Sequence, residues 1–150
     1  GAHVRAHKRL ALWRLPPVLV VHLKRFAFTE TSREKLSQQV AFPLEGLDVG
    51  KALADASPSR EGGEAPLYDL YAVCCHMGTL SHGHYTALCH NHQDGNWYNF
   101  NDGVVSKAEI TPALLAKLRK DAYVLFYRRR ELGSPPPQLR AAAETLGAGA

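Results

Sequence analysis

The sequence predicts an α+β fold that is mostly antiparallel β-sheet, with one or two short helices. Two patterns lead to this prediction. β-branched and aromatic residues gather in short runs separated by turns of a few residues, which is typical of antiparallel strands. A helix start occurs near residue 111. The chain has 150 residues, of which 45% are apolar, so it is long enough for one domain with a hydrophobic core.

Strands are expected wherever the β-branched and aromatic residues cluster. The first strand follows the Pro16-Pro17 pair, which breaks the preceding segment. Residues 67–101 hold three runs joined by the short turns MGTLSHG and HQDG, and such spacing predicts an antiparallel meander. The expected strands are residues 18–26, 67–76, 84–91, 96–101 and 122–128.

A short helix is expected to begin after Thr111. Threonine is a favourable N-cap, and Pro112 suits the first helical position because it has no amide hydrogen to leave unpaired. Leu114, Leu115 and Leu118 recur at helical spacing, so they should form the buried face.

Two segments lack any periodicity. Residues 46–66 are rich in Gly, Ala, Ser and Glu, and residues 131–150 contain a PPP run followed by an Ala/Gly tail. We therefore expect one domain at residues 1–130, with a flexible insertion loop at 48–66 and a disordered tail at 131–150.

Composition excludes several classes of protein. The formal net charge is +4, and charged residues make up 21% of the chain, which argues against a wholly disordered, collagen-like or disulfide-dense protein. No run of about 20 apolar residues is present, and we expect no signal peptide because the first residues lack an apolar core of the right length. The three cysteines form no CxxC pair, so we expect free thiols and a cytoplasmic or nuclear location.

Charge is unevenly distributed along the chain. Residues 1–26 carry six basic side chains and no acidic one, whereas residues 45–69 carry six acidic and two basic side chains. The basic stretch is either a solvated face or a patch for an acidic partner or nucleic acid. It lacks the interleaved aromatic residues that a nucleic-acid-binding sheet would need.

The segment from residue 78 to residue 103 holds the main candidate chemistry. His84 follows a turn that contains Gly78 and Gly83, where an imidazole could transfer protons at a surface cleft. Asn101 and Asp102 end the next strand across the hairpin and could accept a hydrogen bond from this imidazole. By spacing alone, a structural histidine beside a turn that ends in Asn-Asp-Gly is the favoured interpretation.

A nucleophile and a metal site are harder to find. Cys74, Cys75 and Cys89 lie within strands in apolar surroundings, which favours inert thiols over a reactive thiolate. The histidine pairs of this sequence lack partner ligands at zinc spacing, so no metal site is expected in the chain.

Five blocks together resemble the ubiquitin-specific protease family, whose members are cysteine peptidases that remove ubiquitin. In chain order the blocks are LPPVLVVHLKRF, YDLYAVCCHMG, GHYTALCHN, WYNFNDGVV and AYVLFYRR. The resemblance implies a papain-like fold of fingers, palm and thumb. This chain would be its C-terminal part, mostly palm sheet.

The resemblance also implies roles for individual residues. His84 matches the catalytic histidine, Asn101 matches the third triad position, and Asp102 matches a neighbouring acid that assists. The turn before His84 matches a loop that closes over the ubiquitin tail. The implied substrate-binding residues are Met77, Gly78, Ser81, His82, Gly83 and Tyr85.

Two departures from the family pattern suggest a fragment of a longer enzyme. The block with the nucleophilic cysteine is absent, and so are the CxxC pairs that bind zinc in the fingers; no cofactor is therefore expected in this chain. Ser81 and His82 also replace the usual glycines of the turn.

The expected function is hydrolysis of the isopeptide bond at the C-terminal glycine of ubiquitin. The expected partners are ubiquitin, ubiquitinated proteins and the missing N-terminal half, without nucleic acid or membrane. A catalytically dead ubiquitin-binding or scaffold module is the alternative.

Overall fold

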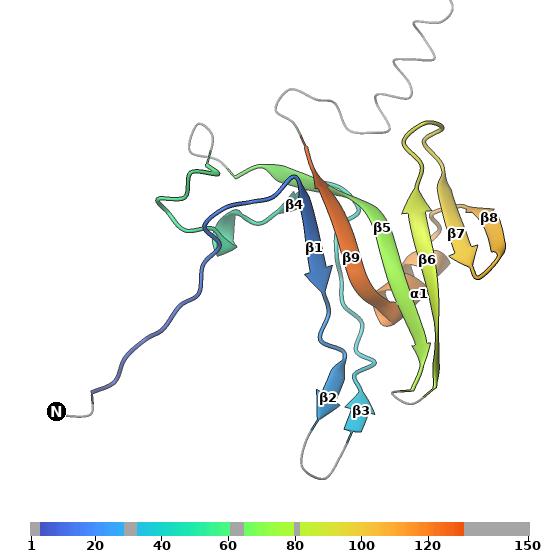
Figure 1. The fold of residues 1–150 in the computed structure, drawn as a ribbon, viewed down its shortest axis with the longest axis horizontal. Helices are drawn as coiled ribbons and strands as arrows, with labels where there is room; N and C mark the ends of the chain where they lie inside the picture. Colours follow the sequence, from blue (N-terminus) through green and yellow to red (C-terminus); the bar gives the residue numbers. More distant parts are fainter. Residues whose placement is uncertain (1–3, 29–32, 61–64, 80–81, 131–150) are drawn as a thin grey trace, which may run out of the picture.

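A seven-stranded antiparallel sheet forms the centre of the molecule (Figure 1). This computed structural model describes residues 4–28, 33–60, 65–79 and 82–130. The main sheet has the order β1-β9-β5-β6-β7-β8, and β4 pairs with β5; β2 and β3 form a separate pair. The strands are β1 (Val18–His22), β2 (Phe26–Phe28), β3 (Arg33–Lys35), β4 (Leu47–Asp48), β5 (Leu67–Gly78), β6 (Gly83–His90), β7 (Trp97–Asn101), β8 (Val104–Ala108) and β9 (Ala122–Arg129).

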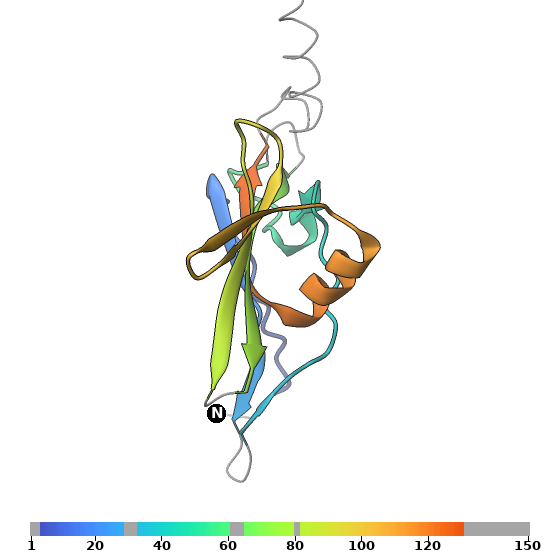
Figure 2. The same ribbon diagram turned by 90° about the vertical axis from the view of Figure 1, so that its right-hand side faces the viewer.

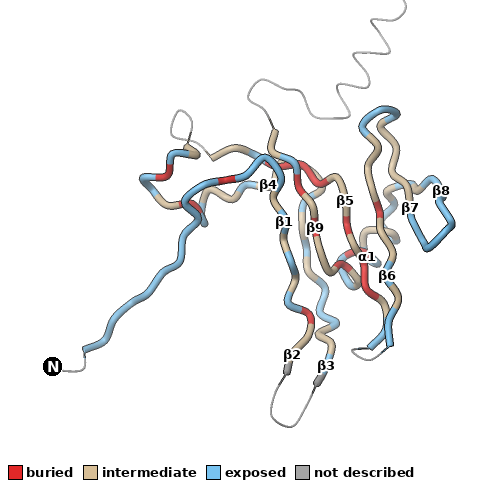
Figure 3. Tube along the Cα trace, in the orientation of Figure 1, coloured by how far each residue is buried: buried red, intermediate tan, exposed pale blue. Residues whose placement is uncertain are grey.

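One face of the sheet is covered. The helix α1 (Pro112–Asp121) and the segment with β4 and the 3-10 helix η1 (Gly50–Ala52) lie on the same side of the strands (Figure 2). The buried residues concentrate on β5 and β9, and the helix contributes Leu118 (Figure 3). Val73, Leu125 and Leu118 belong to this core, and apolar burial of this kind stabilises by about 2 kcal/mol per large side chain.

The predicted fold class is confirmed, and four of the five predicted strands are confirmed with ends shifted by at most two residues. The strand predicted at residues 18–26 is wrong beyond His22. There the backbone leaves the ladder, because the amide of Arg25 donates to the carbonyl oxygen of Leu23, 2.8 Å away. The strands β2, β3, β4 and β8 were not predicted, although Phe26 of β2 was the last residue of the strand expected at 18–26. Among the described residues, no helix is long and apolar enough to cross a membrane.

Arg25 is a buried cation that joins three parts of the fold. Its side chain is 3% exposed. Its guanidinium donates hydrogen bonds to the carbonyl oxygens of Leu36, Gln38, Arg119 and Ala122 at 3.1, 2.8, 2.8 and 2.5 Å. The last two acceptors lie at the C-terminal end of α1, where the helix dipole favours a positive charge. Arg25 belongs to the basic stretch at residues 1–26, and the interpretation of that stretch as a solvated face is wrong for this residue.

The helix α1 begins as predicted. The hydroxyl of Thr111 accepts a hydrogen bond from the amide of Leu114 at 3.2 Å, and Pro112 occupies the first helical position. Leu118 is buried, while Leu114 and Leu115 are partly buried against the core. The helix therefore docks through the predicted leucine face.

The segment predicted as an insertion loop is anchored at two points. Leu53 is 1% exposed and forms a parallel bridge with Leu12. The hydroxyl of Ser57, also buried, donates to the carbonyl oxygen of Trp13 at 2.6 Å. The boundary of the domain at residue 130 and the extent of the loop stay predictions. Residues 61–64 and the predicted tail at 131–150 lie outside the described residues.

Candidate active site

His84 and Asn101 meet across the β6–β7 ladder. The last paired residues of this ladder are Ala87 and Phe100, so the same register would set Asn101 opposite Thr86. His84 is two residues from Thr86 and projects from the same face, which makes it the diagonal neighbour of Asn101. The imidazole Nε2 of His84 lies 2.5 Å from the amide oxygen of Asn101.

This hydrogen bond determines the tautomer of His84. An amide oxygen can only accept, so Nε2 of the neutral ring carries the proton and donates it to Asn101. The second nitrogen, Nδ1, then carries the lone pair. Half of the histidine side chain is covered, with 44% exposed, so the ring stands at an open surface. In the neutral ring, Nδ1 is then the nitrogen able to take a proton from a neighbour.

Asp102 adds a carboxylate beside the same nitrogen. It occupies the two-residue connection between β7 and β8 and has a φ of 50°, a left-handed conformation that Asp tolerates better than most residues. Its Oδ2 atom lies 3.9 Å from Nε2 of His84, and its side chain is 81% exposed. Asp102 can therefore influence the ring through its charge, which solvent screens, while Asn101 makes the direct hydrogen bond.

The hairpin before His84 brings together most of the predicted substrate-binding residues. Met77 pairs with His84, and Gly78 pairs with Gly83. Gly78 has a φ of 105°, and a Cβ there would lie 2.5 Å from the carbonyl oxygen of His82, so only glycine fits. Tyr85 follows His84 and is half-exposed. Ser81 lies outside the described residues.

The three cysteines are held as neutral thiols. All are free. Burial raises the pKa of Cys75 to about 12, with a further contribution from Asp121. Burial also raises the pKa of Cys74 and of Cys89. A thiolate is disfavoured at each position, so the site has a candidate base without an activated thiol among these cysteines.

Metal ligands do not cluster in the described part of the chain. No group of three or more His, Cys, Asp or Glu side chains there could hold an ion. The ring of His90 instead contacts the carbonyl oxygen of Gly95 at 3.2 Å and packs against Trp97.

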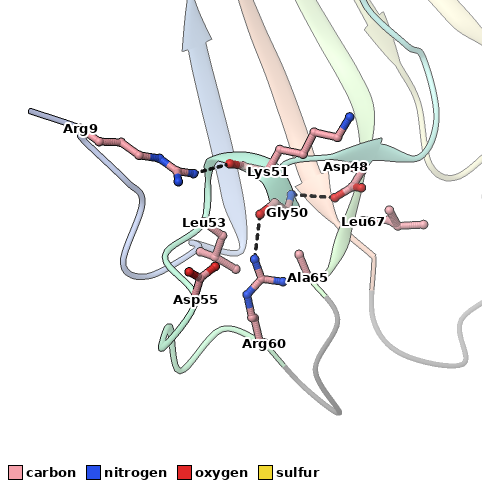
Figure 4. Close-up of a pocket in the computed structure, with 9 residues that line it drawn as sticks. All are labelled: Arg9, Asp48, Gly50, Lys51, Leu53, Asp55, Arg60, Ala65 and Leu67. Atoms are coloured by element: carbon pink, nitrogen blue, oxygen red, sulfur yellow. Dashed lines mark hydrogen bonds between the residues drawn. The ribbon is translucent and has the colours of Figure 1, made fainter. Parts of the chain in front are cut away.

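Two cavities lie away from the His84 site. The larger, about 640 Å³, sits beside η1 and is lined by charged side chains that include Arg9, Lys51 and Asp55 (Figure 4). Arg9 donates to the carbonyl oxygen of Lys51 at 3.0 Å, which ties the N-terminal segment to this wall. The smaller, about 290 Å³, is lined mainly by Tyr98, Phe100 and neighbouring residues of β6–β8. Neither cavity is lined by His84, Asn101 or Asp102.

One residue beside the site was missed by sequence reasoning. His76 lies within the apolar run of β5 and is 4% exposed, although histidine is seldom so deeply buried. Its ring lies against Gly83, directly before His84. The only signal in the sequence is this glycine at the start of a strand, where a close approach is a common reason for glycine.

Comparison with known proteins identifies the family. The family model described as ubiquitin carboxyl-terminal hydrolase matches residues 3–127. The chain is 43% identical over 150 residues to ubiquitin carboxyl-terminal hydrolase 15 of Rattus norvegicus, covering 99% of the chain and 15% of that protein. It is 41% identical over 153 residues to ubiquitin carboxyl-terminal hydrolase 43 of Homo sapiens, covering 86% of the chain and 13% of that protein.

A solved structure has the same fold. The SAGA Ubp8/Sgf11/Sus1/Sgf73 DUB module bound to ubiquitin aldehyde matches with a TM-score of 0.65 and 34% identity, over 81% of this chain and 26% of that one. The chain thus spans a small part of the relatives that it matches. It belongs to the ubiquitin carboxyl-terminal hydrolase family, and its sheet and helix correspond to the C-terminal part of a ubiquitin-specific protease catalytic domain.

Proposed function

We propose that this chain supplies the general base and its orienting residue to a deubiquitinating cysteine peptidase. The observation that carries the proposal is the 2.5 Å hydrogen bond from Nε2 of His84 to Asn101, which leaves Nδ1 as a proton acceptor. His84 is the base, Asn101 orients it, and Asp102 adds negative charge.

The reaction follows from these roles. Nδ1 of His84 takes the proton of a cysteine thiol, and the thiolate attacks the carbonyl carbon of the C-terminal glycine of ubiquitin. The carbon–nitrogen bond to the substrate lysine breaks, and the imidazolium gives its proton to the leaving amine. Water, deprotonated at Nδ1, then attacks the thioester and releases ubiquitin, and the proton from Nδ1 returns to the thiolate.

The attacking thiol is proposed to lie outside this chain. A nucleophilic cysteine needs a lowered pKa or an adjacent base, whereas burial raises the pKa of Cys74, Cys75 and Cys89. The relatives are much longer than the chain, which leaves room for a catalytic cysteine elsewhere in the protein. Free thiols also favour the cytoplasm or nucleus as the location.

Ubiquitin is the proposed ligand of the hairpin before His84. The names of the relatives refer to ubiquitin hydrolysis, and the Ubp8 module was solved with ubiquitin aldehyde. Met77, Gly78, Gly83 and Tyr85 lie beside His84 on β5 and β6, and His82 directly precedes β6, so all five are proposed to contact the ubiquitin tail. Ser81 is proposed to join them.

A non-catalytic ubiquitin-binding module is the second candidate. It is favoured by the raised pKa of all three thiols, which leaves this chain without a nucleophile of its own. The two candidates differ in whether His84 acts on a thiol that belongs to the rest of the protein.

Labelling with ubiquitin that carries a thiol-reactive C-terminus separates these candidates. The full-length protein and this chain alone are treated with the probe, and mass spectrometry locates the modified cysteine. We expect labelling of a cysteine other than Cys74, Cys75 and Cys89, lost in the His84→Ala variant. Labelling of one of these three that depends on His84 would contradict the proposed source of the thiol. Binding of ubiquitin without labelling would favour the non-catalytic module.

A further inference from the structure

We propose that His76 is a positioning residue that holds His84 from the opposite face of the sheet. The inference rests on the proposed function of His84 and extends it to a residue that touches no substrate. His76 lies on β5 and pairs with Tyr85, while its neighbour Met77 pairs with His84. Because successive strand residues face opposite ways, the His76 ring and the His84 ring lie on opposite faces.

The first contact is with the residue before His84. An ideal Cβ on Gly83 would lie 2.0 Å from Nε2 of His76, and the next two nearest atoms also belong to this ring. The imidazole therefore occupies the space where a side chain would stand. The backbone of Gly83 cannot move towards His76 without a clash, which fixes one side of the His84 position.

The second contact is with the residue after His84. The ring centroids of His76 and Tyr85 are 4.7 Å apart, within the range of favourable aromatic contacts. Both flanking residues of His84 thus touch the same imidazole. Displacement of the His76 ring would shift the backbone at residues 83–85 and the base between them.

Further contacts hold the imidazole of His76. Phe26 and Tyr123 lie on its other sides, with ring centroids 5.4 and 6.1 Å away. Lys35 donates a hydrogen bond to the carbonyl oxygen of His76, which fixes its backbone. These contacts connect β2, β3 and β9 to the support of the candidate base.

The shape of the ring, rather than its polar atoms, accounts for this position. Nδ1 of His76 is buried and has no hydrogen-bond partner among the described residues. A buried unpaired nitrogen costs free energy. The ring between Gly83 and Tyr85 compensates for this cost by filling the space that glycine leaves.

A pair of substitutions tests the inference. His76→Ala removes the support, and Gly83→Ala pushes the backbone away from the ring. Each alone should lower kcat of the full-length protein about tenfold or more, because a displaced base affects the chemical step. His76→Ala should keep KM within about twofold, because His76 touches no substrate. In the double variant the new methyl group enters the space left by the ring, so its kcat should be no lower than that of the worse single variant.

The matched control is His90→Ala, which removes another ring-packed histidine on β6 without touching residues 83–85. It should leave kcat unchanged. In nitrogen-15 imidazole spectra of this chain, His84 should change from the Nε2–H tautomer to a mixture in His76→Ala and in Gly83→Ala.

Three results would overturn the positioning role: an unchanged His84 tautomer and kcat in His76→Ala, kcat losses that multiply in the double variant, or equal losses in His90→Ala. If His76→Ala fails to fold, Gly83→Ala carries the same test. The spectra do not depend on hydrolysis. A change of tautomer in a protein that never cleaves ubiquitin would therefore contradict the proposed function and leave the positioning intact.

Discussion

His84 and Asn101 are diagonal neighbours on adjacent strands, and their side chains nevertheless meet at 2.5 Å. The contact depends on where β7 ends. Asn101 is its last residue, and Asp102 turns the chain away with a positive φ. The same turn brings the Asp102 carboxylate to 3.9 Å from the imidazole. The end of β7 thus places both the amide oxygen of Asn101 and the carboxylate of Asp102 near Nε2 of His84.

Asp102→Asn should lower kcat of the full-length protein by less than about tenfold. The carboxylate is 3.9 Å from Nε2 and 81% exposed, so solvent and salt screen its effect on the imidazolium. The loss should shrink as ionic strength rises in steady-state assays. A loss as large as that of Asn101→Ala, independent of salt, would make Asp102 the residue that orients His84.

Arg25→Leu should destabilise the fold by about 3 kcal/mol. The substitution removes the hydrogen bonds that Arg25 donates to four carbonyl oxygens, two of them at the end of α1. Urea unfolding followed by tryptophan fluorescence measures the loss. The exposed neighbour Lys24 offers a matched control, since Lys24→Leu removes a charge without removing these bonds. Equal stability of the two variants would contradict the structural role of Arg25.

Stability should fall in acid through His76. Burial lowers the pKa of His76 below its ordinary 6.5, with a smaller effect of Lys35. The folded state therefore keeps the ring neutral while the unfolded chain takes up a proton. The free energy of unfolding should thus decrease as the pH falls below about 6.5, and level off below the lowered pKa.

The measurement is urea unfolding between pH 8 and pH 5. The variant His76→Phe, which cannot titrate at this position, should show a smaller decrease than the parent. The ring is faced by the titratable side chains of Tyr85 and Tyr123, and the charge of Lys35 acts on it. Identical pH profiles of parent and variant would show that His76 is protonated equally in both states.

Cys75 should resist alkylation in the folded chain. Its pKa of about 12 leaves almost no thiolate at neutral pH, and its side chain is 6% exposed. Iodoacetamide should modify Cys75 only after denaturation, as followed by peptide mass spectrometry. Cys74 and Cys89, both partly exposed, should react first. Early modification of Cys75 would contradict its burial.

The sequence predicted those parts of the fold that depend on local pattern. Strands near 67–101 follow from β-branched and aromatic runs, and α1 follows from the Thr111 cap. The turn of the chain at Arg25 was not predictable, because the acceptors for its guanidinium come from residues up to 97 positions away. The short β3 consists of the charged residues REK, which carry no strand pattern.

For the candidate site, too, the sequence predicted some residues and not others. His84, Asn101 and Asp102 came from matching sequence blocks, and spacing alone favoured a structural histidine. The diagonal placement of His84 and Asn101 could not be predicted without the register of β6 and β7. In that register, Ala87 and Phe100 are the last pair of the ladder. His76 was missed because its contacts with Phe26 and Tyr123 join strands far apart in the sequence.

In the proposed mechanism, Asn101 holds His84 as the base for a thiol that the rest of the protein provides. Steady-state hydrolysis of a ubiquitin C-terminal amide by the full-length protein, measured with ubiquitin binding, tests it most directly. His84→Ala should lower kcat by at least about a hundredfold and spare binding. Asn101→Ala should lower kcat about tenfold or more, and the double variant should lose no more than His84→Ala alone, because both act through one imidazole. Losses that multiply in the double variant, or an Asn101→Ala variant with full activity, would contradict the account.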